Sequence, residues 1–371
     1  MRGLIRAFKG ESDSCARRVN LKATNLGLLR YAYDAILNYL TYRVGTMALF
    51  RAKGPVDGSK ASLKTRFRAW WEGYELDPSA RPAANIAAAP GTKAKAAQPQ
   101  PGIVPLYPWE TPRMRIQQQI WGAGYHKPGG NDYILMLVKP FALNPSMCVM
   151  ELGAGLGGGT RVIASEFGIG VSGYEPSAEL AKAGKELSIM AGLEKKAEVI
   201  RYDEEQFAPR DGAYDCILSS ETLFLLEDKD KLLIKLERAL KTHGQIVVTD
   251  FVRADDVPDT DARLQGLEGS DGVCKVFWST ADYVRRFREL NFDLWVNEDM
   301  TINYRRLAMD GWVTFTQSGG EKSANARAFP DALVAEVELW TRRMAAMDSG
   351  AIKVMRFYAV KLGSNKLMSN S

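Results

Sequence analysis

The fold is decided by the stretch CVMELGAGLGGGTRVIASEFG, Cys148–Gly168. A short apolar run leads into the acid Glu151, then into a loop made almost wholly of glycine and alanine, then into an amphipathic segment. Glycines at such a turn let the backbone approach a ligand closely. The helix that follows presents free N–H groups and the positive end of its dipole. The stretch therefore predicts a strand, a loop and a helix that bind a nucleotide-like ligand with an anionic or carboxylate part.

Short apolar strands alternate with amphipathic helices from residue 144 onward. We expect strands at 147–152, 170–174, 197–202, 214–219, 244–250, 292–297 and 354–361. We expect helices at 160–167, 178–191, 228–240 and 280–290. This alternation is typical of a doubly wound α/β sheet that is mostly parallel and carries helices on both faces.

Acidic residues end three successive strands. Glu151 ends the first, where a carboxylate disfavours a pyrophosphate and suits an ammonium or sulfonium group. Glu175 ends the second strand and can accept hydrogen bonds from both hydroxyls of a ribose. Asp203 ends the third, where it can accept a hydrogen bond from the amine of an adenine. The glycines of GAGLGG (residues 153–158) also match the fingerprint of NAD(P)-binding Rossmann domains, which is the alternative interpretation.

An acid, a glycine loop and two further acids at successive strand ends resemble the pattern of class I S-adenosylmethionine-dependent methyltransferases. The resemblance runs from about residue 144 to the end of the chain. It implies a seven-stranded, Rossmann-like sheet whose last strand, Lys353–Leu362, is inserted antiparallel, and it implies S-adenosylmethionine as cofactor. The residues that it places at the cofactor are Tyr125, Gly130, Glu151, Gly153, Gly155, Gly157, Glu175, Asp203 and Ser219.

Two further segments resemble the phosphoethanolamine N-methyltransferases. They are IWGAGYHKPGGNDY, which precedes the first strand, and EDKDKLLIKLERALKTHGQIVVTDF. In that family the first segment closes over the cofactor, and Tyr125 and Gly129–Gly130 fall on matching positions. Glu221 also matches, and the resemblance implies that it is an acid near the methyl donor.

Other positions depart from that family. Its Tyr–His pair, which holds the substrate amine and removes a proton, falls near Trp109 and on Leu225. Its phosphate-binding residues would fall within 270–278, where only Lys275 is suitable. The cofactor half therefore matches and the phosphobase half does not, which implies either a different substrate or loss of catalysis.

Two residues are candidates for catalysis. His126 borders the expected site, and a histidine near its reference pKa can take a proton at neutral pH. The alternative for His126 is a surface histidine in a turn. Glu221 follows Ser219 and Ser220 at the end of the fourth strand, beside the expected donor methyl, and the alternative for all three is a polar strand end that caps the next turn.

Cysteine and histidine usage predicts no metal site. The four cysteines lack metal-ligand spacing, and the chain has only two histidines. Cys148 and Cys216 lie inside apolar, strand-like runs, so we expect buried thiols and a reducing compartment.

The chain divides into three parts by composition. Residues 1–76 form a basic, partly helical extension, residues 77–106 an Ala/Pro-rich linker, and residues 107–371 a methyltransferase domain with a lid segment at 107–143. Residues 1–100 hold 17 Lys/Arg against 7 Asp/Glu, a net charge of +10. This charge suits an anionic membrane surface or a protein assembly, and nucleic acid is not expected; the alternative is a solvated basic region. An amphipathic helix at 27–50 fits docking on a partner, on a membrane or over the main domain.

The sequence as a whole predicts an S-adenosylmethionine-dependent methyltransferase that acts on a small or lipid-like acceptor. The alternative is a methyltransferase-fold subunit with little or no activity that serves a larger, membrane or mitochondrial, assembly. We expect a cytoplasmic protein, peripheral on a membrane, or a mitochondrial one if the chain is eukaryotic.

Overall fold

The structure is a computed structural model that describes residues 106–268 and 277–363. Several predicted features lie outside these ranges: the extension 1–76, its helix 27–50, the linker 77–106 except for its last residue, and Lys275. Predictions on these features therefore stay predictions. None of the helices within the described ranges is long and apolar enough to cross a lipid bilayer.

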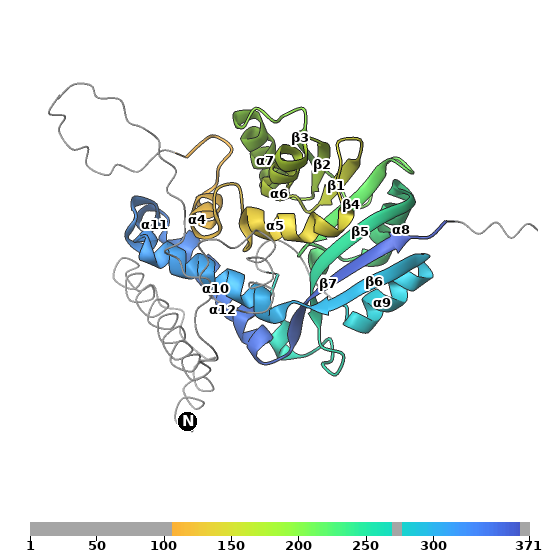
Figure 1. The fold of residues 1–371 in the computed structure, drawn as a ribbon. Coiled ribbons are helices and arrows are strands. Elements are labelled where there is room, and N and C mark those ends of the chain that lie inside the picture. The colour runs from red at the N-terminus through yellow and green to blue at the C-terminus, as the bar shows by residue number, and fades with distance from the viewer. Residues whose placement is uncertain (1–105, 269–276, 364–371) are drawn as a thin grey trace, which may run out of the picture. The chain divides into compact units, whose positions relative to one another are not determined.

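Seven strands form one sheet in the order β3-β2-β1-β4-β5-β7-β6 (Figure 1). The strands are β1 (Cys148–Leu152), β2 (Gly170–Glu175), β3 (Ala197–Arg201), β4 (Tyr214–Ser220), β5 (Leu240–Arg253), β6 (Phe292–Asp299) and β7 (Ile352–Lys361). The first five are parallel, and β7 runs antiparallel between β5 and β6. The expected seven-stranded sheet with an antiparallel insertion is confirmed.

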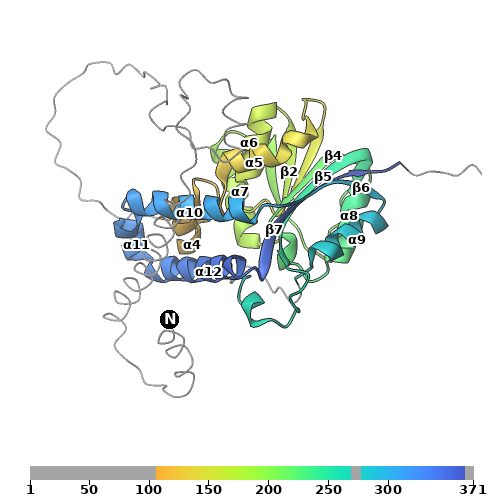
Figure 2. The same ribbon diagram turned by 60° about the horizontal axis from the view of Figure 1, so that its bottom comes forward.

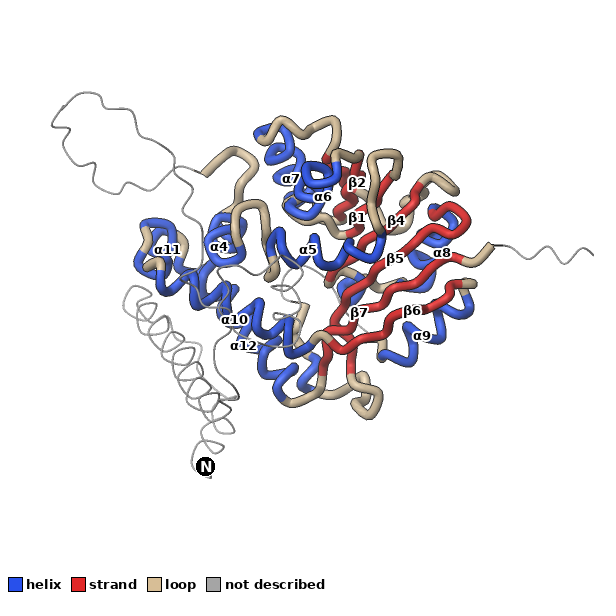
Figure 3. Tube along the Cα trace, viewed as in Figure 1, coloured by secondary structure: helices blue, strands red, loops and turns tan. Residues whose placement is uncertain are grey.

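The central strands are apolar because helices cover both faces of the sheet. Helices α8 (Lys229–Ala239) and α9 (Thr280–Glu289) pack on one face through a buried apolar cluster that includes Leu233 and Phe287. Helices α5 (Gly130–Val138), α6 (Gly158–Phe167) and α7 (Ala178–Met190) lie on the other face (Figure 3). The four helices predicted from the amphipathic pattern are present within two residues of the expected bounds.

The prediction of two buried thiols is half wrong. Cys216 lies in the middle of β4 and is fully buried, and burial raises the pKa of its thiol to about 12. Cys148 is exposed, because it is the first residue of β1 and its N–H donates to Asp215 Oδ2 at 2.8 Å rather than to the neighbouring strand. An apolar run predicts a strand, but its end residues can still face water.

A helical insertion between β6 and β7 was not predicted. It consists of α10 (Thr301–Gln317), α11 (Ala324–Ala328) and α12 (Pro330–Asp348). Because β6 runs parallel to β5, it ends at the carboxyl edge of the sheet, where ligands bind in this class of fold. The insertion groups there with α4 (Pro112–Trp121) from the lid segment (Figures 1 and 2).

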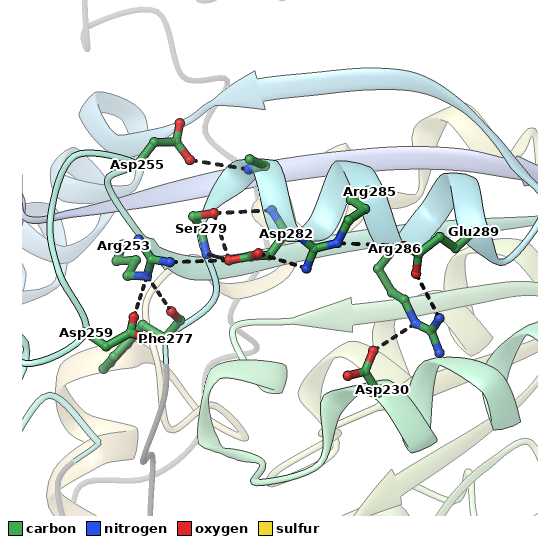
Figure 4. Close-up of polar contacts among 11 residues, drawn as sticks. Asp230, Arg253, Asp255, Asp259, Phe277, Ser279, Asp282, Arg285, Arg286 and Glu289 are labelled. Atoms are coloured by element: carbon green, nitrogen blue, oxygen red, sulfur yellow. Dashed lines mark hydrogen bonds and ion pairs between the residues drawn. The ribbon is translucent and has the colours of Figure 1, made fainter.

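A polar network fixes the start of α9 (Figure 4). Ser279 and Asp282 form a capping box, in which Ser279 Oγ accepts from the Asp282 N–H at 3.2 Å and Asp282 Oδ2 accepts from the Ser279 N–H at 2.9 Å. Arg253, the last residue of β5, donates to the Phe277 carbonyl at 3.0 Å and pairs with Asp259 at 2.6 Å. The network therefore ties the helix cap to the end of a central strand.

We predict that Ser279→Ala lowers the free energy of unfolding by about 1 kcal/mol, because it removes the oxygen that caps the first turn of α9. Urea denaturation followed by circular dichroism measures the change. Ser318→Ala is the matched control, since Ser318 is exposed and its hydroxyl bonds only the Phe315 carbonyl at the end of α10. Equal midpoints for both variants would contradict a stabilising role for the cap.

Candidate functional site

The glycine loop lies at the carboxyl end of β1. Gly153, Gly155 and Gly157 have φ of 74°, 55° and 75°, a region that favours glycine. The Gly155 N–H donates to Glu175 Oε2 at 2.8 Å, and the Ser177 N–H donates to Oε1 of the same carboxylate at 2.9 Å. Glu175, at the end of β2, therefore holds the loop in place as well as facing the site.

A cavity of about 770 Å³ opens beside this loop. Its walls come from the glycine loop, the ends of β2 and β4, the lid segment and the insertion, and include Gly153, Glu175, Glu221, Tyr304, Glu336 and Arg343. A cavity of this size suits a cofactor together with a small second ligand. Within the part of the chain that is described, no group of three His, Cys, Asp or Glu side chains is placed to hold a metal ion.

Three of the predicted cofactor residues line a smaller cavity behind the glycine loop instead. These are Tyr125, Gly130 and Glu151. Glu151 Oε2 accepts a hydrogen bond from Thr160 Oγ1 at 2.5 Å, and burial raises the pKa of this carboxyl although the Thr160 hydrogen bond opposes the shift. The Tyr125 hydroxyl donates to Asn131 Oδ1 at 2.6 Å. Glu151 and Tyr125 thus support the loop from behind.

The remaining predicted residues divide between loop and strand positions. Asp203 is exposed and its Oδ1 accepts from the backbone N–H groups of Glu205 and Gln206, while its neighbour Glu204 lines the large cavity. Ser219 is fully buried in β4, and its hydroxyl has no hydrogen-bond partner among the described residues. An adenine contact by Asp203 therefore stays a prediction. The acid that lines the cavity after this strand is Glu204.

His126 touches the glycine loop, since a Cβ on Gly155 would collide with its imidazole. It lines both cavities, as expected for a residue that borders the site. Burial, together with the positive charges of Lys127, Arg113 and Arg343, lowers the pKa of His126 to about 3. The lowered pKa disfavours a proton on the imidazole near neutral pH, and a catalytic role for His126 stays a prediction.

Glu221 has a strained backbone conformation and a buried side chain beside the large cavity. It follows β4 with φ of 40°, a left-handed conformation that is strained for glutamate, and its side chain is buried. Oε1 accepts hydrogen bonds from the Tyr133 hydroxyl and from Thr249 Oγ1, both at 2.7 Å. Oε2 forms no hydrogen bond within the described ranges, and the Lys127 ammonium lies 3.8 Å from it. Glu221 therefore lines the large cavity with its carboxylate held in one orientation.

The position of the family's missing histidine lies on the same wall. Leu225 occupies the position of the family's catalytic histidine and lines the large cavity. The cavity therefore has an apolar side chain where that family has a base. Trp109 is not part of this wall: it stacks on Tyr107 with ring centroids 5.0 Å apart and packs against Met114 and Leu156.

Sequence reasoning missed the residues that the insertion brings to the cavity. Tyr304 comes from α10, and Glu336 and Arg343 come from α12. The Arg343 guanidinium lies 5.1–5.6 Å from the ring centroids of Phe224, Phe251 and Trp340, and its Nε donates to the Leu267 carbonyl. The signal was present: Tyr304, Ala308 and Phe315 recur at helical spacing and are buried.

The described residues fit S-adenosylmethionine. Gly153 and Gly155 let Thr222 and His126, which also line the cavity, lie against the loop, because side chains at these positions would collide with them. The Glu175 carboxylate faces the cavity, where its remaining lone pairs can accept from ribose hydroxyls.

We predict that the imidazole of His126 shows no titration between about pH 5 and 8, because an ordinary histidine pKa of about 6.5 is lowered by burial. The unfolded chain takes up this proton below its pKa and the folded chain does not, so His126 costs stability as pH falls through about 6.5. Two-dimensional NMR of the imidazole signals, with His126→Gln for assignment, measures it. An inflection near neutral pH assigned to His126 would contradict the burial argument.

Comparisons with known proteins agree with this geometry. A family model described as a methyltransferase domain matches residues 131–296. Phosphoethanolamine N-methyltransferase 3 of Arabidopsis thaliana is 24% identical over 190 residues, 51% of this chain and 38% of that protein. Phosphoethanolamine N-methyltransferase 2 of Caenorhabditis elegans is 30% identical over 136 residues, 36% of this chain and 30% of that protein. This chain thus aligns with well under half the length of these two relatives.

A solved structure supports the fold. Phosphoethanolamine N-methyltransferase 2 of Haemonchus contortus, in complex with S-adenosyl-L-methionine, superposes with a TM-score of 0.58 at 20% identity, over 68% of this chain and 58% of that one. The seven-stranded sheet, the glycine loop and the family match lead to one conclusion. This chain has the Rossmann-like methyltransferase fold, its residues 131–296 match the methyltransferase domain model, and the expected resemblance to the phosphoethanolamine N-methyltransferases is confirmed.

Proposed function

We propose that this protein transfers a methyl group from S-adenosylmethionine to a small-molecule acceptor. The observation that carries the proposal is Glu221, which is strained, buried and fixed through Oε1, and which lines the cavity beside the glycine loop. Strained residues of this kind concentrate at functional sites, where the surrounding structure holds them in place. An oriented carboxylate beside a cofactor loop suits an acceptor that has a proton to lose.

The roles in cofactor binding follow from position. The glycine loop and the N-terminus of α6 would hold the anionic part of the ligand, and Glu175 would accept from the ribose. S-adenosylmethionine, when bound, supplies a methyl group on a positively charged sulfur that is already activated for transfer. The protein therefore needs mainly to bring the acceptor into line and to exclude water.

The roles in acceptor binding belong to Glu221 and its neighbours. Tyr133 and Thr249 hold the Glu221 carboxylate through Oε1, and the carboxylate can take a proton from an acceptor in the cavity that Glu221 lines. Burial and the nearby Glu221 charge raise the pKa of Tyr133 well above its usual value, so the phenol keeps its proton and remains a donor. The aromatic rings of Phe224 and Phe251 complete an apolar wall.

The relatives support a small acceptor. Their names include phosphoethanolamine and, for a protein of Halorhodospira halochloris that is 27% identical over 117 residues, sarcosine and dimethylglycine. A lipid-like acceptor is the alternative to a small polar one, and the apolar wall of the cavity supports it. The comparisons lend no support to the alternative of a purely structural subunit.

The part played by residues 1–100 stays a proposal. Their net charge of +10 supports attachment to an anionic membrane surface or to an acidic protein surface, at the membrane face of the cytoplasm or inside a mitochondrion. Such attachment would weaken with salt, because exposed charges are screened beyond about 8 Å at physiological ionic strength.

We predict that S-adenosylhomocysteine binds the wild-type protein and that Glu175→Ala weakens this binding ten- to a hundredfold, the loss of about 1.5–3 kcal/mol expected for charge-assisted hydrogen bonds. Isothermal titration calorimetry measures it. Glu166→Ala is the control, because Glu166 is exposed on α6 away from both cavities. Absence of binding by the wild type would refute the methyltransferase proposal, and tight NADH binding would revive the Rossmann alternative.

We predict that phosphoethanolamine is a poor acceptor, at least about a hundredfold slower than a matched acceptor, because Leu225 lines the cavity where the family has a base. A radiolabel assay with S-adenosylmethionine measures transfer, and Leu225→His is the companion variant. Efficient methylation by the wild type would show that the alignment of this segment is wrong.

A further inference from the structure

The lid segment places a lysine ammonium beside Glu221. Lys127 Nζ donates to the carbonyl of Ser220, the last residue of β4, and lies 3.8 Å from Glu221 Oε2. The Lys127 side chain is largely buried and lines the large cavity. Its charge also opposes the rise that burial causes in the pKa of Glu151. A charge that is largely removed from water is costly unless a counter-charge is near, so the two acids stabilise the ammonium at this place.

Glu221 is itself surrounded by groups of the protein. Tyr133 and Thr249 donate to Oε1, both at 2.7 Å, and Lys127 approaches Oε2. Burial, the charge of Glu221 and a hydrogen bond to the Glu221 side chain all raise the pKa of Tyr304 well above its usual value. Three hydroxyls and one ammonium therefore surround this carboxylate, and Lys127 fills the place that a cationic ligand would take.

The Lys127 ammonium can bind more than its protein partners. It carries three N–H groups, and among the described residues it makes one hydrogen bond, to the Ser220 carbonyl. The distance of 3.8 Å to Glu221 Oε2 is too long for a second one. Glu221 thus supplies a counter-charge without using a donor, and the ammonium can donate to a ligand oxygen in the cavity that it lines.

Further cations lie at this end of the cavity. Arg113 and Arg343 line the cavity as Lys127 does, and Arg113 pairs with Glu336 at 3.4 Å. Burial, together with these three positive charges, lowers the pKa of His126 to about 3, so its imidazole is uncharged. The potential around His126 therefore favours a negatively charged group on a ligand.

An apolar wall belongs to the same cavity. Phe224, Leu225 and Phe251 line it, and the rings of Phe224 and Phe251 pack edge-on with centroids 5.0 Å apart. Aromatic and aliphatic walls of this kind suit a flat, apolar ligand body. A ligand that combines an aromatic ring with an oxygen that becomes negative fits both the wall and the Lys127 ammonium.

We propose that the acceptor is a phenol-like hydroxyl compound and that Lys127 binds its oxygen as an oxyanion. The proposal rests on the proposed function and names its acceptor class. The O–H bond of the hydroxyl breaks, its electron pair stays on the oxygen, and its proton is released to water. The Lys127 ammonium stabilises the resulting anion by its charge and by an N–H donor. Glu221 serves this step by holding the ammonium in place.

The test uses the full chain saturated with S-adenosylhomocysteine, and the probe is 4-nitrophenol, whose ionised form is yellow. Absorbance against pH gives the midpoint at which the bound probe ionises. We expect the wild type to lower this midpoint by at least about one pH unit relative to the free probe, as an opposite charge nearby does. Lys127→Met should abolish the lowering and bind the anion at least about tenfold more weakly. Lys127→Arg should keep the lowered midpoint, because it keeps the charge.

Lys196→Met is the matched control. Lys196 also donates to a backbone carbonyl, that of Gly168 at 3.3 Å, but it is exposed and lines neither of the two cavities described above. This variant should lower the midpoint of the probe as the wild type does. Unchanged S-adenosylhomocysteine affinity in every variant shows that the site remains folded.

Three results would separate the possible failures. If the wild type binds S-adenosylhomocysteine but leaves the midpoint of 4-nitrophenol unchanged, or if Lys127→Met lowers it as the wild type does, the oxyanion site is overturned. It is also overturned if Lys127→Met weakens S-adenosylhomocysteine as much as the probe, because the ammonium then binds the cofactor carboxylate. If the wild type binds no S-adenosylhomocysteine, it is the proposed function that fails.

Discussion

The buried carboxylate of Glu336 is the contact on which the enclosure of the site depends. It is 1% exposed and accepts hydrogen bonds from the indole N–H groups of Trp121 and Trp340, at 3.2 and 3.0 Å, and from Gln117 at 3.2 Å. These donors come from α4 of the lid segment and from α12 of the insertion, which are more than two hundred residues apart in the chain. A buried charge is tolerated only when it is fully hydrogen-bonded, so this acid fixes lid against insertion.

The enclosure in turn determines the electrostatics of the cavity. Helices of the insertion extend beyond the carboxyl edge of the sheet. The side chains of Glu175 and Glu221 at this edge are therefore buried and not exposed to water. Charges then interact more strongly: the pKa of His126 falls and that of Tyr304 rises, each shift favouring the neutral form. The same desolvation makes Glu221 an effective contact for a cation, since its charge is weakly screened.

Sequence patterns predicted the sheet well because each strand is an apolar run whose ends are marked by turn residues. The acids Glu175 and Glu221 lie at the ends of two of these strands, at the same edge of the sheet. The details that a sequence pattern does not resolve depend on single side chains. Asp203 has a short carboxylate that caps the backbone of Glu205 and Gln206, so the longer Glu204 reaches the cavity instead. The sequence did not predict that the insertion covers the carboxyl edge of the sheet. Helical periodicity can show that Tyr304 lies on a buried face, but it cannot show which part of the protein that face contacts.

The sheet and the helices that cover its carboxyl edge, from the lid segment and the insertion, contribute different residues to the cavity. This separation explains how one fold can serve different acceptors. The sheet positions the glycine loop and Glu175, the residues that we expect to bind the cofactor, at the ends of paired strands. The cover supplies Tyr304 and Arg343 from helices that join the sheet only through β6 and β7. An apolar Leu225 at the usual place of a base therefore does not by itself imply an inactive domain. A polar group delivered by the cover reaches the same cavity, and Glu221, held by Tyr133 and Thr249, provides the oriented oxygen that such a group needs beside it.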